Sequence, residues 1–289
     1  MRKWLRWLIT WMPPVLMAPS AAGQLSCTVS APTMNFGNYT GALSTPGATP
    51  MTVTCLILTS YTVALNAGVG AGATTTTRKM TGPGSATLSY QMFQNSSRAI
   101  NWGNTVGTDT VSGVGSSGPQ TINIYPQAAA GQTVAAGTYN DTITISVTGL
   151  LGTVTNTFTV TAVVPTTCTI SASALSFGNY SGALIDASSV LTVTCTNLTT
   201  FNIGLSAGTA IGATVTTRKM TSPALATLNY TLFRDGPRTL NWGNTVGTDT
   251  LISQGIGAPQ MLGVFGRIPG GQLALPAVYT DTIIATITY

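Results

Sequence analysis

The sequence contains no histidine, and charged residues make up only 6% of its 289 residues. Glutamate is absent as well, so every acidic side chain is an aspartate: Asp109, Asp141, Asp186, Asp235, Asp249 and Asp281. Acid–base catalysis would therefore have to rest on Asp, Tyr or Lys. Four of the aspartates lie in turn-rich or strand-initiating segments, where a carboxylate ordinarily accepts backbone hydrogen bonds. We expect a protein that is not an enzyme and uses no cofactor.

The apolar run near the N-terminus is shorter than the roughly 20 residues that a membrane span needs, and prolines interrupt it. Residues 1–22 begin with three cations, continue with this run and end in the small residues Ser20 and Ala22. This pattern is typical of a secretory signal peptide, with a single membrane anchor as the rival interpretation. We expect export through the periplasm.

A strong net charge is also lacking once the leader is removed. Loss of Arg2, Lys3 and Arg6 lowers the formal charge from +5 to +2. The remaining chain has no basic character that would attract nucleic acid. We expect no nucleic-acid partner.

The segment NWGNTVGTDT at residues 101–110 occurs again at residues 241–250. Other pairs keep the same offset of 140 residues or one of 141: TTTRKMT and VTTRKMT, ATLSYQMF and ATLNYTLF, TYNDTI and VYTDTI, NFGNYTGAL and SFGNYSGAL. A period of this length fits a whole domain rather than a solenoid unit. The repeat predicts two homologous domains in tandem, at residues 25–164 and 166–289.

The four cysteines share the repeat. Cys27 and Cys55 are 28 residues apart, and Cys168 and Cys195 are 27 apart. Four cysteines allow three pairings, but the repeated spacing in an exported chain favours one disulfide inside each domain. A metal site is the alternative, and it lacks both histidine and CxxC spacing.

Helical periodicity is missing after the leader, whereas period-two alternation and β-branched runs recur throughout the chain. Examples are MTVTCLILTSYTVAL, ATLSYQMF, DTITISVT and DTIIATITY, which are bounded by Gly, Pro and Asn. Such segments predict short strands. We expect an all-β protein built from two tandem immunoglobulin-like β-sandwiches. In the repeated decapeptide, Trp102 is expected to plug the sandwich while the turns close over it.

The two halves differ at their ends. After DTITISVT the first half continues through GLLG into TVTNTFTVTAVV, at residues 153–164, in which threonines alternate with mostly apolar residues. The second half has no counterpart before Tyr289, so its sandwich is predicted to lack its final strand and to expose a groove. Because Cys27 follows closely on the leader, we expect the chain to accept a strand and to donate none.

Several of these motifs resemble the spore coat U domain family, the pilin modules of archaic, Csu-type chaperone–usher fimbriae. They are TCTISASALSFGNYSGAL, NWGNTVGTDT, VFGRIPGGQ and YTDTIIATITY, and the resemblance covers both halves. Two such modules in one chain resemble the two-domain tip adhesin of these fimbriae. The resemblance implies capture by a periplasmic chaperone, passage through an outer-membrane usher, and completion of the C-terminal domain by a strand from the next pilin subunit.

The first domain departs from the family pattern. GRIPGGQ at 266–272 corresponds to PQAAAGQ at 126–132, and Leu56 and Ile57 follow Cys55 where Thr196 and Asn197 follow Cys195. Exposed apolar loop residues would suit contact with an abiotic or host surface, and the candidates are Leu56, Ile57, Leu150 and Leu151. The alternative is that these residues pack into the sandwich.

The last strand carries the candidate groove residues Ile283, Ala285, Ile287 and Tyr289, which alternate on one face. A chaperone or donor strand could place its apolar residues beside them. The function that follows is that of a fimbrial tip subunit that mediates attachment and biofilm formation at the cell surface. The alternatives are a structural coat or matrix protein, a non-adhesive fimbrial subunit, and a tip that binds glycans.

Overall fold

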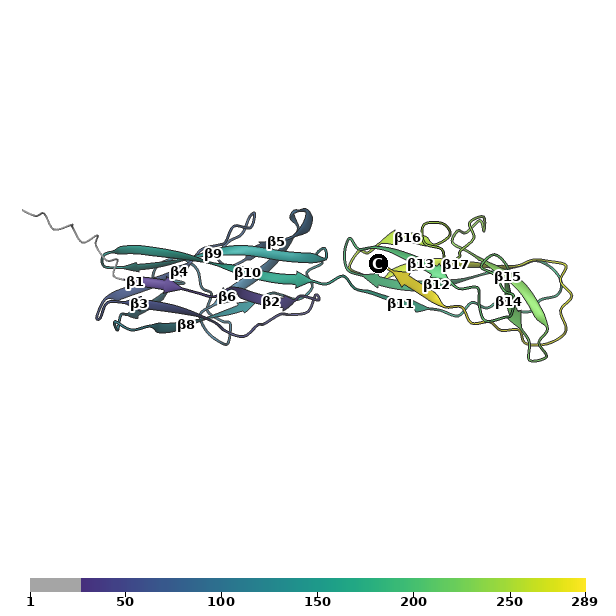
Figure 1. Ribbon diagram of the computed structural model, residues 1–289, viewed down its shortest axis with the longest axis horizontal. Coiled ribbons are helices and arrows are strands. Elements are labelled where there is room, and N and C mark those ends of the chain that lie inside the picture. Colours follow the sequence, from purple (N-terminus) through teal and green to yellow (C-terminus); the bar gives the residue numbers. More distant parts are fainter. Residues whose placement is uncertain (1–26) are drawn as a thin grey trace, which may run out of the picture.

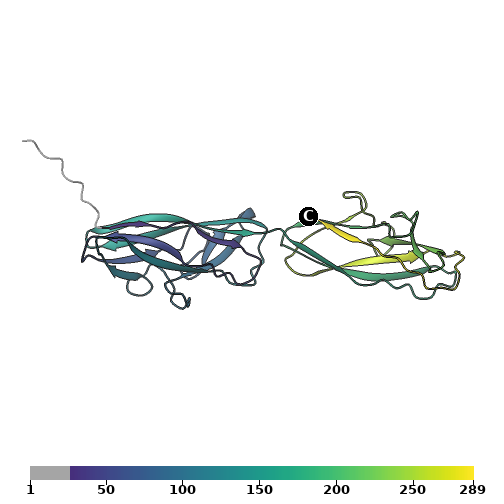
Figure 2. The same cartoon turned by 60° about the horizontal axis from the view of Figure 1, so that its bottom comes forward.

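The computed structural model describes residues 27–289, so the predicted leader at residues 1–22 lies outside the described residues. In this part of the chain the only helical element is the 3₁₀ turn η1 (Pro83–Ser85). Two elongated sandwiches follow one another along the chain and lie end to end (Figures 1 and 2). No helix among residues 27–289 is long and apolar enough to cross a membrane.

The first domain contains ten strands. They are β1 (Cys27–Ser30), β2 (Met34–Asn38), β3 (Thr49–Cys55), β4 (Ser60–Leu65), β5 (Arg78–Thr81), β6 (Thr87–Phe93), β7 (Val111–Val114), β8 (Gln120–Gln127), β9 (Gly137–Gly149) and β10 (Gly152–Val164). Their order is β1-β3-β8-β6-β5-β9-β10-β2, and β4 pairs with β7 and β9. The strands thus wrap around one core.

Strand β10 closes this first sandwich. It pairs with β9 in antiparallel register over its whole length, from Gly152–Gly149 to Val164–Gly137. Its other edge pairs with β2 in parallel, with Val160 opposite Met34. Phe158, Val160, Ala162 and Val164 are buried, while the threonines between them face outward as the alternation predicts. Strand β10 therefore covers the core between β9 and β2.

The second domain contains eight strands. They are β11 (Cys168–Ala172), β12 (Ile185–Cys195), β13 (Thr200–Leu205), β14 (Arg218–Thr221), β15 (Thr227–Phe233), β16 (Leu251–Gln254), β17 (Gln260–Ile268) and β18 (Ala285–Thr288). One sheet has the order β11-β12-β17-β15-β14 and the other the order β16-β13-β18. Within residues 27–289 this domain has no strand equivalent to β10.

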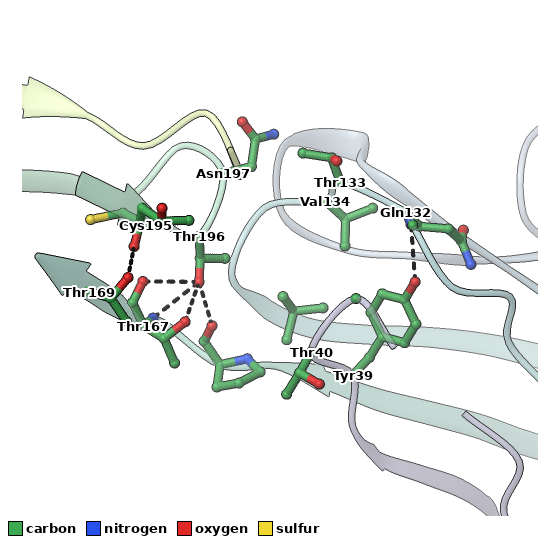
Figure 3. A pocket seen from close by; sticks show the side chains of 16 residues that line it. Tyr39, Thr40, Gln132, Thr133, Val134, Thr167, Thr169, Cys195, Thr196 and Asn197 are labelled. Carbon is green, nitrogen blue, oxygen red and sulfur yellow. Dashed lines mark hydrogen bonds between the residues drawn. The ribbon is translucent and has the colours of Figure 1, made fainter. Parts of the chain in front are cut away.

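Each domain holds one disulfide at the same place. Cys27 pairs with Cys55 and Cys168 pairs with Cys195, as the repeated spacing predicts. Both bridges join the first strand of a domain to the strand beside it, β1 to β3 and β11 to β12. The disulfide of the second domain lies next to the junction between the domains (Figure 3).

The junction is short and hydrogen-bonded. Only residues 165–167 separate β10 from β11. The Thr196 hydroxyl donates to the carbonyl of Pro165 (3.0 Å) and accepts from the amide of Thr167 (3.1 Å), as Figure 3 shows. Ala135 of the first domain also forms a parallel bridge with Asn197 of the second. The loop after Cys195 therefore ties the second domain to the base of the first.

Candidate functional site: an open groove and an apolar end

An open groove runs along the second domain where β10 lies in the first. The groove contains a cavity of about 410 Å³. Apolar side chains supply most of its lining: Leu175, Phe177, Leu191, Leu205, Met220, Leu232, Val264, Tyr279, Ile283 and Ala285. We call this surface the open groove. Its size and lining suit the apolar side chains of an added strand.

The two edges of the open groove have less strand structure than the equivalent edges of the first domain. Strand β9 spans Gly137–Gly149, whereas its repeat-equivalent β18 spans only Ala285–Thr288. Residues 175–179, which correspond to β2, form no strand at all. Met34 and Phe36 are buried, but the equivalent Leu175 and Phe177 are only partly covered. Both edges therefore offer unpaired backbone groups to an incoming strand.

A tyrosine–aspartate pair lies in the wall of the open groove. The Tyr230 hydroxyl donates to Asp281 Oδ2 (2.7 Å), and the amide of Thr209 donates to Asp281 Oδ1 (2.9 Å). Tyr90 and Asp141 make the same bond at 2.7 Å beneath β10. Burial, and then the neighbouring carboxylate, raises the pKa of both phenols far above its usual range. Both tyrosines thus remain proton donors at neutral pH, with β10 present or absent.

The structure brings together three of the four predicted groove residues. Ile283 and Ala285 line the open groove, and Ile287 packs on the same core. Tyr289 lies beyond the end of β18 and is 58% exposed, so the predicted alternation does not extend to it. Sequence reasoning missed the opposite wall at Leu175 and Phe177, although the repeated FGNY motif marks that segment.

Apolar side chains gather at the end of the first domain that faces away from the junction. Leu56 and Ile57 are 54% and 65% exposed, so the alternative that they pack inside the sandwich is wrong. Leu150 and Leu151, in the β9–β10 turn, are 88% and 64% exposed. The two segments are neighbours because Tyr61, just after the first of them, pairs with Gly149 at the start of the turn.

Leu58 belongs to the same surface, and sequence reasoning missed it. It is 82% exposed and adopts a positive φ of 60°. Its amide donates to the carbonyl of Gly115 (2.9 Å), and the amide of Ile57 donates to Ser117 Oγ (2.9 Å). We call residues 56–58 and 150–151 the distal loops. Hydrogen bonds to residues 115–117 hold the first of these loops in place.

The described residues offer little chemistry beyond these surfaces. Among residues 27–289, no group of three or more His, Cys, Asp or Glu side chains could hold a metal ion. Asp186 forms ion pairs with Arg267 (2.8 Å) and Arg238 (3.3 Å), and these pairs are partly exposed. The arrangement is suited to binding other polypeptides or surfaces.

Both domains are immunoglobulin-like sandwiches of the pilin type. The chain belongs to the Spore Coat Protein U domain family, whose family model matches residues 15–146 and again residues 154–286. It is also 37% identical over 128 residues to Protein U of Myxococcus xanthus, a match that covers 40% of this chain and 71% of that protein. The predicted family resemblance is confirmed.

Two solved structures are similar to the chain over most of its length. The chain is similar to the CsuC–CsuE chaperone–tip adhesion subunit complex of archaic Csu pili from Acinetobacter baumannii, with a TM-score of 0.52, 15% identity, and coverage of 91% of this chain and 100% of that one. The CupB6 tip adhesin of Pseudomonas aeruginosa gives a TM-score of 0.44 and 11% identity, with coverage of 91% and 94%. The likeness to the A. baumannii complex shows a shared fold over most of this chain.

Proposed function

We propose that the chain is a fimbrial subunit whose second domain is completed by a strand from another subunit. The observation that carries this proposal is the contrast between two homologous sandwiches, one filled by β10 and one open at the same place. An open groove with two free edges invites aggregation unless a partner covers it. Strand addition would pair the backbone edges and fill the groove with apolar side chains.

Strand β10 supplies a template for the missing strand. Phe158, Val160, Ala162 and Val164 fill the first domain. Because β9 and β18 are repeat-equivalent, the donated strand would run antiparallel to the last strand and parallel to residues 175–179. Its inward residues would lie opposite Ile283, Asp281 and Tyr279, as those of β10 lie opposite the equivalent residues of β9. The donor is therefore a segment of alternating apolar residues, with small side chains near its end.

Before assembly, a periplasmic chaperone would occupy the open groove, and an outer-membrane usher would then exchange it for the next subunit. The chaperone–subunit complex from A. baumannii supports this order, since that subunit has the same fold. The secretory leader expected at residues 1–22 is consistent with periplasmic passage.

Within the fimbria, the first domain would stand at the tip and attach to abiotic or host surfaces, which promotes biofilm formation. Its distal loops support this proposal, because they expose five apolar side chains at the end of the first domain that faces away from the second domain. An exposed apolar patch on a soluble domain marks an interaction site.

The test is to supply the missing strand within the chain. Tyr289 corresponds to Gly149, so residues 150–164 can be appended directly after Tyr289. We expect the second domain's Tm to rise by about 10 °C or more, because four buried apolar side chains contribute several kcal/mol. The matched control carries Phe158→Asp and Val160→Asp in the added copy only, and should melt like the unextended chain. Equal stabilisation by both extensions would contradict the proposal.

The alternatives predict other outcomes. A coat or matrix protein would reach the surface without a chaperone or usher, and electron microscopy would show no fimbriae. A non-adhesive fimbrial subunit would assemble but leave attachment unchanged when the first domain is deleted.

A further inference from the structure

The second domain presents an apolar segment at the end that faces away from the junction. We call residues 271–278 the base segment. The amide of Gly271 donates to Gly182 O (2.8 Å), and that of Gln272 donates to Tyr180 Oη (2.9 Å). Gly131 and Gln132 make the equivalent bonds in the first domain, at 2.8 and 3.1 Å. Equivalent hydrogen bonds therefore fix the backbone of both segments, and their side chains can be compared position by position.

The side chains of the two segments differ in polarity and size. Leu273 and Leu275 replace Thr133 and Ala135. Leu273 is fully exposed and Leu275 is 66% exposed, whereas Ala135 is buried. A hollow of about 620 Å³ lies beside Leu275 and includes Leu228, Ile268 and Val278 in its lining. The base segment is thus apolar and uncovered in the described chain.

In the first domain, the equivalent segment is covered by the domain that follows. Asn197 bridges Ala135, and Gly257 lies against Thr133 so closely that a Cβ at Gly257 would be 2.4 Å from Thr133 Cγ2. Threonine is the commonest residue in the lining of the hollow at this junction: Thr40, Thr133, Thr167, Thr169, Thr194 and Thr196. Figure 3 shows the loop of Thr196 and Asn197 facing Thr133 and Val134.

The connection between the domains enforces this contact. Only residues 165–167 separate the strand that fills the first domain from the first strand of the second. Any subunit that fills the open groove through a similarly short connection must bring its body against the base segment.

We propose that the base segment is the docking surface for the body of that subunit, a second domain of this same fold. The contact would be made by the loop after the cysteine that is equivalent to Cys195. Because Leu273 and Leu275 stand where the first domain has Thr133 and Ala135, the partner's loop is apolar rather than Thr–Asn. The two leucines therefore select which subunit follows. This inference rests on the proposed function, since the partner arrives through the open groove.

Two extended chains test the proposal. The first carries residues 150–164 after Tyr289, which fill the open groove but bring no body. The second carries residues 150–289 followed by another copy of 150–164, which adds a closed domain. It is made with the natural loop and with Thr196→Leu and Asn197→Ile in the added domain only. Hydroxyl-radical footprinting measures solvent access at Leu273 and Leu275, with the exposed Ile252 as internal control.

We expect labelling of both leucines to fall several-fold in the three-domain chain relative to the strand-only chain, and to fall further with the Leu–Ile loop. Equal labelling in all chains would overturn the proposal, and stronger protection by the Thr–Asn loop would overturn the selectivity. Concentration-dependent protection in the unextended chain would assign the surface to a second copy instead. A strand-only extension that leaves the Tm unchanged would mark failure of the proposed function itself.

Discussion

Two buried arginines explain why the chain repeats a decapeptide. Arg78 Nη2 donates to the carbonyls of Trp102 (2.7 Å) and Leu65 (3.1 Å), and Arg218 repeats both bonds with Trp242 and Leu205. Both indoles are fully buried, which agrees with a structural role for the repeat. Burial lowers the pKa of Arg78 to about 10, so the guanidinium remains charged at neutral pH. The repeated sequence thus preserves a buried hydrogen-bond network.

Arg78→Met tests this network. The substitution leaves four carbonyls without their donor, those of Leu65, Asn66, Thr75 and Trp102. We expect the free energy of unfolding of the first domain to fall by about 3–5 kcal/mol. Lys79→Met on the same strand is the control and should cost less than about 0.5 kcal/mol. Calorimetry of the full chain measures the first domain's transition, and equal effects of the two variants would refute the assignment.

At the scale of the element, the sequence predicts which strands exist better than it predicts where each strand begins and ends. Alternation and the 140-residue repeat predict both sandwiches, and the unmatched residues 153–164 predict the missing strand. The length of β18 could not be predicted, because a strand without a neighbour loses its ladder although its alternation is intact. The exposure of Leu56 and Ile57 could not be predicted either. The conformation of the turn decides whether apolar residues after a cysteine pack into the core or point into solvent.

Hydrogen exchange should reveal the missing neighbour. We expect the amides of residues 175–179 and of Tyr279, Asp281 and Ile283 to exchange fast in the unextended chain, because they lie on edges without a neighbouring strand. The amides of Thr280, Thr282 and Ile284 donate hydrogen bonds within the domain and should exchange more slowly. The equivalent residues 34–38 and 139–144 should be protected, since β10 pairs with both β2 and β9. Appending residues 150–164 after Tyr289 should slow exchange in the second domain only. Slow exchange at Tyr279, Asp281 and Ile283 without any added strand would show that the groove is closed by other means.

At the scale of the whole molecule, the distal loops lie at the end of the first domain that faces away from the second domain (Figure 1). The two segments that contain the distal loops, residues 52–62 and 146–157, include no charged side chain. Contact through them would therefore be apolar and would depend little on salt. Each contact is weak, at roughly 25 cal/mol per Å² of buried apolar surface, so strong attachment needs many fimbriae together.

Substitution of the distal loops by serine tests the attachment role. We expect Leu150→Ser with Leu151→Ser, and separately Leu56→Ser with Ile57→Ser, to reduce adhesion to plastic while fimbria number is unchanged. The residues are exposed, so stability should change by less than about 0.5 kcal/mol in each pair. Matched serine substitutions at the exposed Val69 and Val106, outside the distal loops, serve as control. Adhesion should also favour plastic over clean glass at both low and high salt.

Normal attachment by both distal variants, together with loss of attachment on deletion of the first domain, would move the binding surface to other loops of that domain. Attachment that survives the deletion would remove the adhesin role and leave that of a capping or assembly-initiating subunit.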